Sequence, residues 1–227
     1  MDGRCRLPEA CECGAQFTIE HALSCKKGGF VSIRHNELRN FTAKLLRKVC
    51  HDVKIEPSLE ELSGEVLSKS SNISTEARLD ISARGFWETH QKAFFDVRVF
   101  NPLARRYVNL DPSKSYEINE KEKKRCYNQR VMEIEHGSFT PLVFSATGGY
   151  SRECRKFYKR LSAMIAEKEH SRYSDVITHI YRKINFALLR SIIICVRGSR
   201  SVSTPGNEEN AANFDIRTSE QLVRMNI

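Results

Sequence analysis

The fold is decided by the stretch Ala93-Phe94-Phe95-Asp96-Val97-Arg98-Val99-Phe100. Aromatic and β-branched residues dominate it, and polar side chains alternate with apolar ones, which predicts a β-strand. A similar run, Ala77-Arg78-Leu79-Asp80-Ile81-Ser82-Ala83, lies shortly before it in the chain, and Gly85 stands near the turn between them. We therefore expect the two runs to pair as a β-hairpin.

Helical and strand patterns surround this hairpin. Apolar residues recur every three or four positions from Phe30 to Cys50, as on the buried face of a helix. A short strand is expected at Val53–Glu56, before Pro57. The chain after the hairpin is predicted to form a charged helix, a strand and two helices: Tyr116–Met132, Phe139–Ala146, Ser151–Lys168 and Asp175–Val196. This order predicts an α/β core, in which helices flank a small sheet on both faces.

The same patterns divide the chain into four parts. Residues 1–29 form a cysteine-bearing head, and residues 30–150 form the α/β core, which includes a polar surface loop at residues 58–75. Residues 151–197 are a helical extension. Residues 198–227 are expected to be a linker or a disordered tail, because Ser, Asn, Glu, Pro and Gly dominate their first half.

Composition restricts the partners and the compartment. The chain of 227 residues carries a formal net charge of +9, which favours nucleic acid as a partner and, second, an acidic membrane surface. The N-terminus lacks a signal-peptide pattern. The longest apolar stretch, Phe186–Val196, is too short to span a bilayer and contains Arg190. We expect a nuclear or cytoplasmic protein without a membrane partner, in a compartment where thiols stay reduced.

The head carries a set of metal-ligand residues. Cys11, Cys13, His21 and Cys25 provide three sulfurs and one imidazole, which is a common structural zinc set. A zinc ion would fold a head that has little apolar surface of its own. Two alternatives remain: Cys5 replaces one of these ligands, or the cysteines are free thiols beside a surface histidine.

Two acidic residues stand within the central strand runs. Asp80 and Asp96 each lie between apolar neighbours, where a buried carboxylate is costly unless it is paired or binds a cation. From neighbouring strands they could converge on Mg²⁺ or Mn²⁺, which would activate a water molecule for attack on a phosphodiester. In the alternative arrangement, one Asp caps a strand end and the other faces solvent.

A catalytic cation is expected near this acidic pair. Arg98 can hold a phosphate but cannot readily act as a base. The charged helix offers Lys123 as the first candidate for a catalytic lysine and Lys124 as the second. The other charges of that helix are interpreted as a solvated surface.

The two C-terminal helices each allow two interpretations. Arg155 and Lys156 belong to a basic run that either follows a DNA backbone or forms the outer face of an amphipathic helix. The last helix is interpreted as core, with Ile192-Ile193-Ile194 buried. If its apolar face is not covered, it becomes a contact for a second copy or for another domain.

These motifs, in this order, resemble the restriction-like endonuclease of site-specific non-LTR retrotransposons. The matching pieces lie between residues 8 and 130. They are the zinc ligands Cys11, Cys13, His21 and Cys25; Arg34-His35-Asn36; Ile55-Glu56-Pro57; Arg78-Leu79-Asp80; Phe95-Asp96-Val97; and Lys123 to Tyr127. The resemblance implies a restriction-endonuclease-like, PD-(D/E)XK core (helix-strand-strand-strand-helix-strand). Within it, Asp80 and Asp96 are metal ligands and the lysine lies on the next helix.

The same resemblance implies a function. Such an endonuclease nicks target DNA so that a 3′ end primes reverse transcription, and its partners are DNA, the RNA of the element and a reverse transcriptase domain. Arg34 is expected to contact phosphate or DNA. The sequence departs from the family at Leu79, where a Pro is usual, and at Glu120, where a His is usual.

The short distance from Met1 to the head leads us to expect no preceding reverse transcriptase, and hence a truncated element, a fragment or a domain retained by a host. The alternative function is a catalytically inactive module of the same fold that binds nucleic acid or protein.

Overall fold

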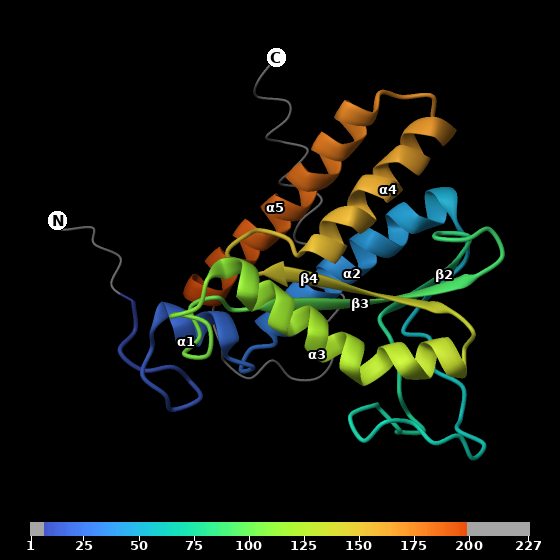
Figure 1. Cartoon of the computed structure of the whole chain (residues 1–227). Helices are drawn as coiled ribbons and strands as arrows, with labels where there is room; N and C mark the ends of the chain where they lie inside the picture. Colours follow the sequence, from blue (N-terminus) through green and yellow to red (C-terminus); the bar gives the residue numbers. More distant parts are fainter. Residues whose placement is uncertain (1–6, 199–227) are drawn as a thin grey trace.

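The structure, a computed structural model, describes residues 7–198 (Figure 1). Cys5 and nearly all of the predicted tail lie outside the described residues. The helices and strands, in chain order, are α1 (Ile19–Ser24), α2 (Phe30–Val49), β1 (His51–Ile55), β2 (Ile81–Arg84), β3 (Lys92–Phe100), α3 (Pro112–Glu133), β4 (Ser138–Ser145), α4 (Arg152–Lys168) and α5 (Tyr173–Arg197). Except for α1, each was predicted, although β2 begins four residues later and α3 four residues earlier than expected.

The sheet has four strands in the order β1-β2-β3-β4. β1 pairs with β2 and β2 with β3 in antiparallel fashion, whereas β3 and β4 are parallel. The predicted hairpin is therefore confirmed, and so is the mixed α/β class. Strand β2 is shorter than its sequence pattern because it begins at Ile81, so Asp80 stands just outside the strand.

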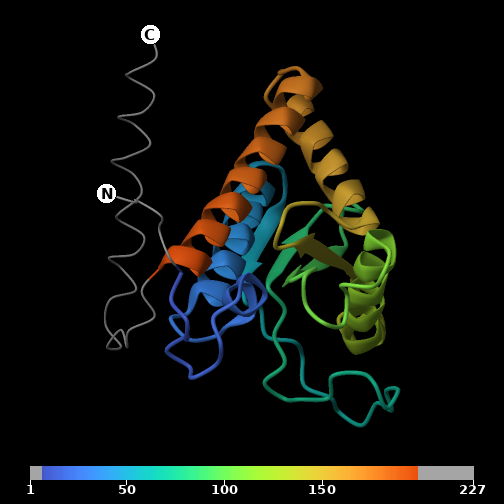
Figure 2. The same cartoon turned by 90° about the vertical axis from the view of Figure 1, so that its left-hand side faces the viewer.

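Helices lie on both faces of the sheet (Figure 2), and an apolar layer fills each side. On one face, Phe95 and Val97 of β3 pack in the main core with side chains of α2, α4 and α5. On the other face, Phe94 packs with Val131 of α3 and with Leu79. Side chains alternate between the faces of a strand, so even-numbered positions of β3 point towards α3. Asp96 therefore lies on the α3 face of the sheet.

Local sequence signals set the helix ends. Helix α3 begins with Asp111, whose side chain accepts a hydrogen bond from the N–H of Ser113, and Pro112 follows at the first helical position. Helix α2 begins after Gly29, whose φ of 71° lies in the left-handed region that favours glycine. This turn lies between α1 and α2.

Helix α5 presents apolar side chains on two faces. Ile180, Ile184 and Leu188 are buried in the main core. On another face, Phe186 and Ile193 are 63% and 52% exposed, so the predicted burial of Ile193 is wrong. Three consecutive residues of a helix point in different directions, so they cannot all lie on its buried face.

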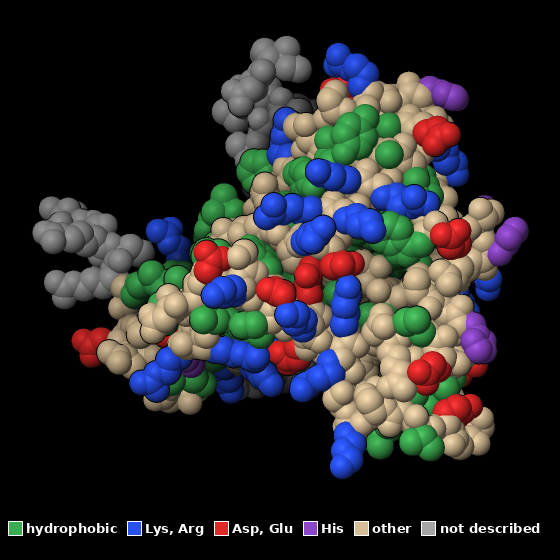
Figure 3. Space-filling view, viewed as in Figure 1, with side chains coloured by type: hydrophobic (Ala, Val, Ile, Leu, Met, Phe, Trp, Pro, Cys, Tyr) green, Lys and Arg blue, Asp and Glu red, His purple; other side chains and the backbone are tan. Residues whose placement is uncertain are grey.

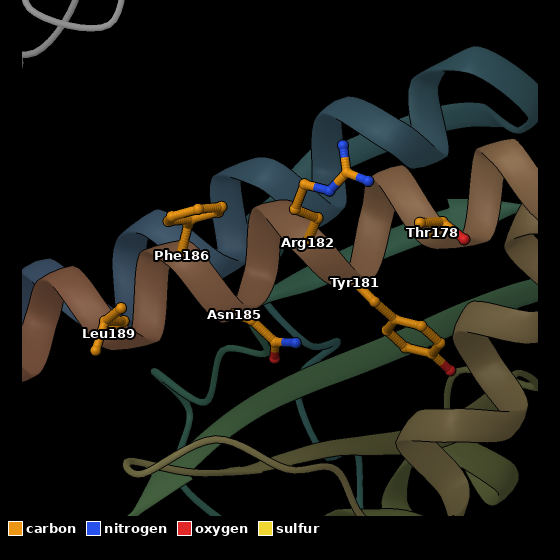
Figure 4. A pocket seen from close by; sticks show the side chains of 6 residues that line it. All are labelled: Thr178, Tyr181, Arg182, Asn185, Phe186 and Leu189. Carbon is orange, nitrogen blue, oxygen red and sulfur yellow. The ribbon is translucent and has the colours of Figure 1, made fainter. Parts of the chain in front are cut away.

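A depression of about 470 Å³ lies along this exposed part of α5 (Figure 4). Its lining residues are Thr178, Tyr181, Arg182, Asn185, Phe186 and Leu189.

Within residues 7–198, no helix is both long enough and apolar enough to cross a bilayer.

The long segment between β1 and β2 is anchored to α3. The guanidinium of Arg130, which is fully buried, donates hydrogen bonds to the carbonyl oxygens of Glu60 at 2.7 Å, Asn72 at 2.8 Å and Ser74 at 2.8 Å. Three bonds from one planar, charged group fix three points of the loop at once. The predicted surface loop therefore has a defined path.

Replacing this anchor should release the loop. We expect Arg130→Lys to lower the free energy of unfolding by roughly 2–4 kcal/mol, because an ammonium cannot reach three separated carbonyls and leaves some of them buried without a donor. Thermal unfolding and the rate of cleavage after Glu60, Glu61 and Glu65 by a glutamate-specific protease measure the effect. Arg125→Lys, an exposed position of the same helix, is the matched control and should change neither. Unchanged cleavage of Arg130→Lys would contradict the anchoring role.

Candidate functional site

Asp80 and Asp96 lie near each other at the end of the β2–β3 ladder. Ile81 pairs with Phe95 in this antiparallel ladder, and Asp80 and Asp96 are the residues next to that pair. Leu79 packs on the α3 face and Ile81 in the main core on the other face, so the alternation of the strand does not extend through the bend at Asp80. The two carboxylates are close enough for the charge of Asp80 to raise the pKa of Asp96.

Two groups hold the carboxylate of Asp80. Its Oδ2 accepts a hydrogen bond from the backbone N–H of Val97 at 2.6 Å, and its Oδ1 lies 3.0 Å from Nε2 of His35 in α2. The backbone of Asp80 is also fixed, because its carbonyl accepts from the N–H of Glu56 at 2.9 Å. The side chain is 16% exposed, so Asp80 does not face open solvent.

Asp96 forms a buried ion pair with the first candidate lysine. Nζ of Lys123 lies 2.7 Å from Oδ2 of Asp96, and the two side chains are 20% and 7% exposed. Burial raises the pKa of Asp96 and Lys123 lowers it, while the charge of Asp80 raises it again, and the net shift is upward. Burial lowers the pKa of Lys123, but the Asp96 carboxylate outweighs this effect and raises it. Lys123 therefore remains an ammonium group near neutral pH.

The oxygen atoms of this pair suit a small hard cation. Oδ2 of Asp96 is buried and accepts no well-aligned hydrogen bond from residues 7–198, although Lys123 is close. Carboxylate oxygens are preferred ligands of Mg²⁺, which commonly binds one or two of them and completes its shell with water and phosphate. Within residues 7–198, the Cys/His set of the head alone brings three or more metal-ligand residues together. The two acids are not part of that set.

The other predicted cations differ in position. Arg98 is half-buried on β3 near Lys123, where its charge disfavours the protonated form of that amine. Lys124 points to α4 instead and forms an ion pair with Glu153 at 3.0 Å. Lys123 is therefore the lysine that the fold brings to the acids.

Arg34 does not reach the surface. Its side chain is enclosed, with the residue only 2% exposed, and its Nη2 donates to the carbonyl of Leu23 at 3.3 Å. The predicted contact between Arg34 and a phosphate is therefore wrong. Instead, Arg34 joins the end of α1 to α2, a role that its position in an amphipathic helix did not reveal.

Arg155 and Lys156 are exposed on α4, where Figure 3 shows Lys and Arg side chains gathered. Nε of Arg155 donates to the carbonyl of Tyr150 at 3.0 Å, and Nζ of Lys156 lies 5.3 Å from the centre of the Trp87 ring. Helix α4 packs on the sheet face opposite to Asp96. These cations therefore form a basic surface apart from the acidic pair.

The four cysteine and histidine ligands of the head converge. Sγ of Cys11 and Sγ of Cys25 are 3.8 Å apart, and Sγ of Cys13 is 3.2 Å from Nε2 of His21. All four ligand atoms lie within 4.8 Å of one another. Sulfur atoms bound to zinc at its usual distance, in a tetrahedron, are roughly 3.8 Å apart. The cluster therefore could hold a metal ion such as zinc.

Local turns bring these ligands together. Gly14, with φ of 87°, closes a tight turn after Cys13, and the side chain of Thr18 caps α1 and so orients His21. A backbone hydrogen bond from Cys13 lowers the pKa of the Cys11 thiol to about 6, against the opposing effect of burial. A thiolate is the form that binds a metal.

The head is docked on the core. Nδ2 of Asn101, the residue after β3, donates to the carbonyl of Glu20 at 2.9 Å and to Oγ of Ser24 at 2.8 Å. Ala22 and Leu23 of α1 are buried. The head therefore shares an interface with the strand that carries Asp96, which the sequence division into separate parts did not indicate.

The sequence pattern predicted no role for His35. It stood in the Arg-His-Asn segment of the resemblance, but nothing in the periodicity of α2 connects it with Asp80, 45 positions further along the chain. One feature of the sequence could have indicated a role at the site: His35 is a histidine near the start of a helix, and that helix ends beside the first strand.

Comparisons with protein-family models and with curated protein sequences found no match for this chain. Function is therefore argued from the residues and their geometry.

Removing one ligand of the head should abolish metal binding. We expect the purified wild-type chain to retain one zinc per chain, and Cys25→Ser to lose most of it and to unfold at a lower temperature, because binding of a structural zinc contributes free energy to folding. Elemental analysis and thermal unfolding measure both effects. Cys126→Ser, a half-buried cysteine of α3, is the control and should keep its zinc. A zinc-free wild type would contradict the assignment.

Proposed function

We propose that this chain is a Mg²⁺- or Mn²⁺-dependent DNA endonuclease with a restriction-endonuclease-like core, of the kind found in site-specific non-LTR retrotransposons. The observation that carries the proposal is the ammonium group of Lys123, which lies 2.7 Å from Asp96, a carboxylate whose pKa is raised by the nearby charge of Asp80. Two carboxylates and a lysine at a sheet end are the set that the resemblance implies, with the lysine displaced onto α3.

The order of helices and strands also supports the proposed restriction-endonuclease-like core. Helix α2, the antiparallel strands β1, β2 and β3, helix α3 and the parallel strand β4 follow one another in the order that the resemblance implies. Asp96 stands on the central strand β3, Asp80 immediately precedes β2, and α3 brings the lysine to Asp96.

The residues of the site would divide the work of hydrolysis. Asp80 and Asp96 would bind the cation, which when bound lowers the pKa of a water molecule and offsets negative charge on the phosphate. Lys123 supplies a second positive charge towards the phosphate oxygens, on which negative charge grows during the reaction. Arg98, next to Lys123 and always charged, holds a neighbouring phosphate.

The charge of the chain supports DNA as the substrate. The formal net charge is +9, and α4 carries exposed cations, including Arg155 and Lys156, that suit a phosphate backbone. In keeping with the resemblance, we propose the RNA of the element and a reverse transcriptase domain as further partners, a retrotransposon origin, and a nuclear or cytoplasmic location.

One observation favours the alternative, an inactive nucleic-acid-binding module of the same fold. The Asp96–Lys123 ion pair balances both charges without a cation. Such a pair persists in a structural role when catalysis has been lost, because removing either partner leaves a buried charge.

Nicking of supercoiled plasmid separates the two functions. We expect the wild type to relax the plasmid in Mg²⁺ or Mn²⁺, Asp96→Ala to be inactive, and Lys123→Met to be about 100-fold or more slower, as expected when a charge that stabilises the transition state is lost. Lys121→Met, an exposed position of the same helix, should nick like the wild type. Thermal unfolding and zinc content identify variants that fail to fold. If the wild type binds DNA in a salt-dependent way but does not nick it with either metal, the inactive module is the correct function.

A further inference from the structure

Helix α2 reaches Asp80 by two routes. His35 and Arg39 lie four positions apart, so they share a face of the helix. Nε2 of His35 contacts Oδ1 of Asp80 directly, at 3.0 Å. Arg39 forms an ion pair with Glu56, whose backbone N–H in turn donates to the carbonyl of Asp80. One helix face therefore fixes both the carboxylate and the main chain of this residue.

The backbone at this point is shaped to make these contacts. Glu56 has a φ of 52°, in the left-handed region that non-glycine residues rarely adopt. The chain leaves β1 there and turns its N–H to Asp80. Unfavourable backbone conformations of this kind persist where the surroundings hold them, and they cluster at functional sites.

The two side-chain contacts fix the plane of the Asp80 carboxylate. His35 holds Oδ1, the N–H of Val97 holds Oδ2 at 2.6 Å, and each oxygen keeps a second lone pair. A carboxylate held at both oxygens cannot rotate, yet it can still bind a cation. Residues that hold a metal ligand in this way typically change metal affinity by about 10- to 100-fold when they are replaced.

We propose that His35 is a positioning residue, which donates its Nε2–H to Asp80 and so orients that carboxylate for the divalent cation. The inference rests on the proposed metal-dependent endonuclease and names the group that sets its affinity for metal. His35 is not itself assigned as a ligand, because its near nitrogen is engaged by Asp80 and imidazole suits Mg²⁺ poorly.

The test measures metal binding as well as activity. Mn²⁺ is titrated by calorimetry into the zinc-loaded full chain, and plasmid nicking is followed as a function of Mg²⁺ concentration. We expect His35→Ala to weaken Mn²⁺ binding about 10- to 100-fold and to raise the Mg²⁺ concentration for half-maximal nicking by a similar factor. Saturating Mg²⁺ should restore most of the maximal rate, because His35 acts through Asp80.

Two further variants separate positioning from simple loss of packing. The side-chain amide nitrogen of Gln can approach the place of Nε2. The side chain of Asn is shorter, so its amide nitrogen corresponds in position to Nδ1. His35→Gln should therefore recover most of the Mn²⁺ affinity, and His35→Asn should not. His179→Ala, which removes an exposed histidine of α5, is the matched control and should bind Mn²⁺ like the wild type.

The outcomes distinguish this inference from the proposed function. If the wild type binds Mn²⁺ and nicks, Asp96→Ala does neither, and His35→Ala binds within about two-fold of the wild type, well below the loss expected here, then the positioning role is wrong and the endonuclease stands. If His35→Asn recovers as much affinity as His35→Gln, the role of Nε2 is wrong. If the wild type itself neither binds Mn²⁺ nor nicks, the proposed function fails and the inference fails with it.

Discussion

The burial of Asp96 is the constraint on which the rest of this structure depends. An ionised carboxylate inside a protein costs several kcal/mol unless an opposite charge and hydrogen bonds offset it. Lys123 supplies that charge, and it can do so only if α3 lies across the β3 side of the sheet. The position of α3 then determines the path of the loop after β1, because the buried Arg130 of the same helix binds three carbonyls of that loop.

The sequence predicted the elements well because their signals are local. Alternation along residues 93–100 and the three-to-four spacing along α2 depend on neighbouring residues alone, and both were confirmed. The same holds for the head, where short spacings bring the four ligands together around Gly14 and the cap of α1. The start of β2 was less predictable: the Asp80 side chain accepts a hydrogen bond from the N–H of Val97, and the strand begins only at Ile81, four residues after the start of the predicted run.

Contacts between distant segments limited the prediction of the site. Asp80, Asp96 and Lys123 could be chosen because buried charge is unusual in strands and because one helix is rich in lysine. The contact between His35 and Asp80 depends on how α2 packs on the sheet, and no local sequence pattern predicts that packing. Arg34 was misassigned for a related reason: a cation at a helix start usually reaches water, but here α1 covers it.

The left-handed conformation of Glu56 affects how this region tolerates change. Two requirements meet at one position: a main chain that prefers glycine and a side chain that pairs with Arg39. Replacement by glycine would relieve the backbone strain but remove the ion pair with Arg39. Replacement by glutamine would keep a hydrogen-bond acceptor for Arg39 but leave the backbone strain. In a saturation screen, losses at position 56 would therefore report a conflict between backbone and side chain, and reading them as proof of a third acidic ligand would mistake local geometry for chemistry.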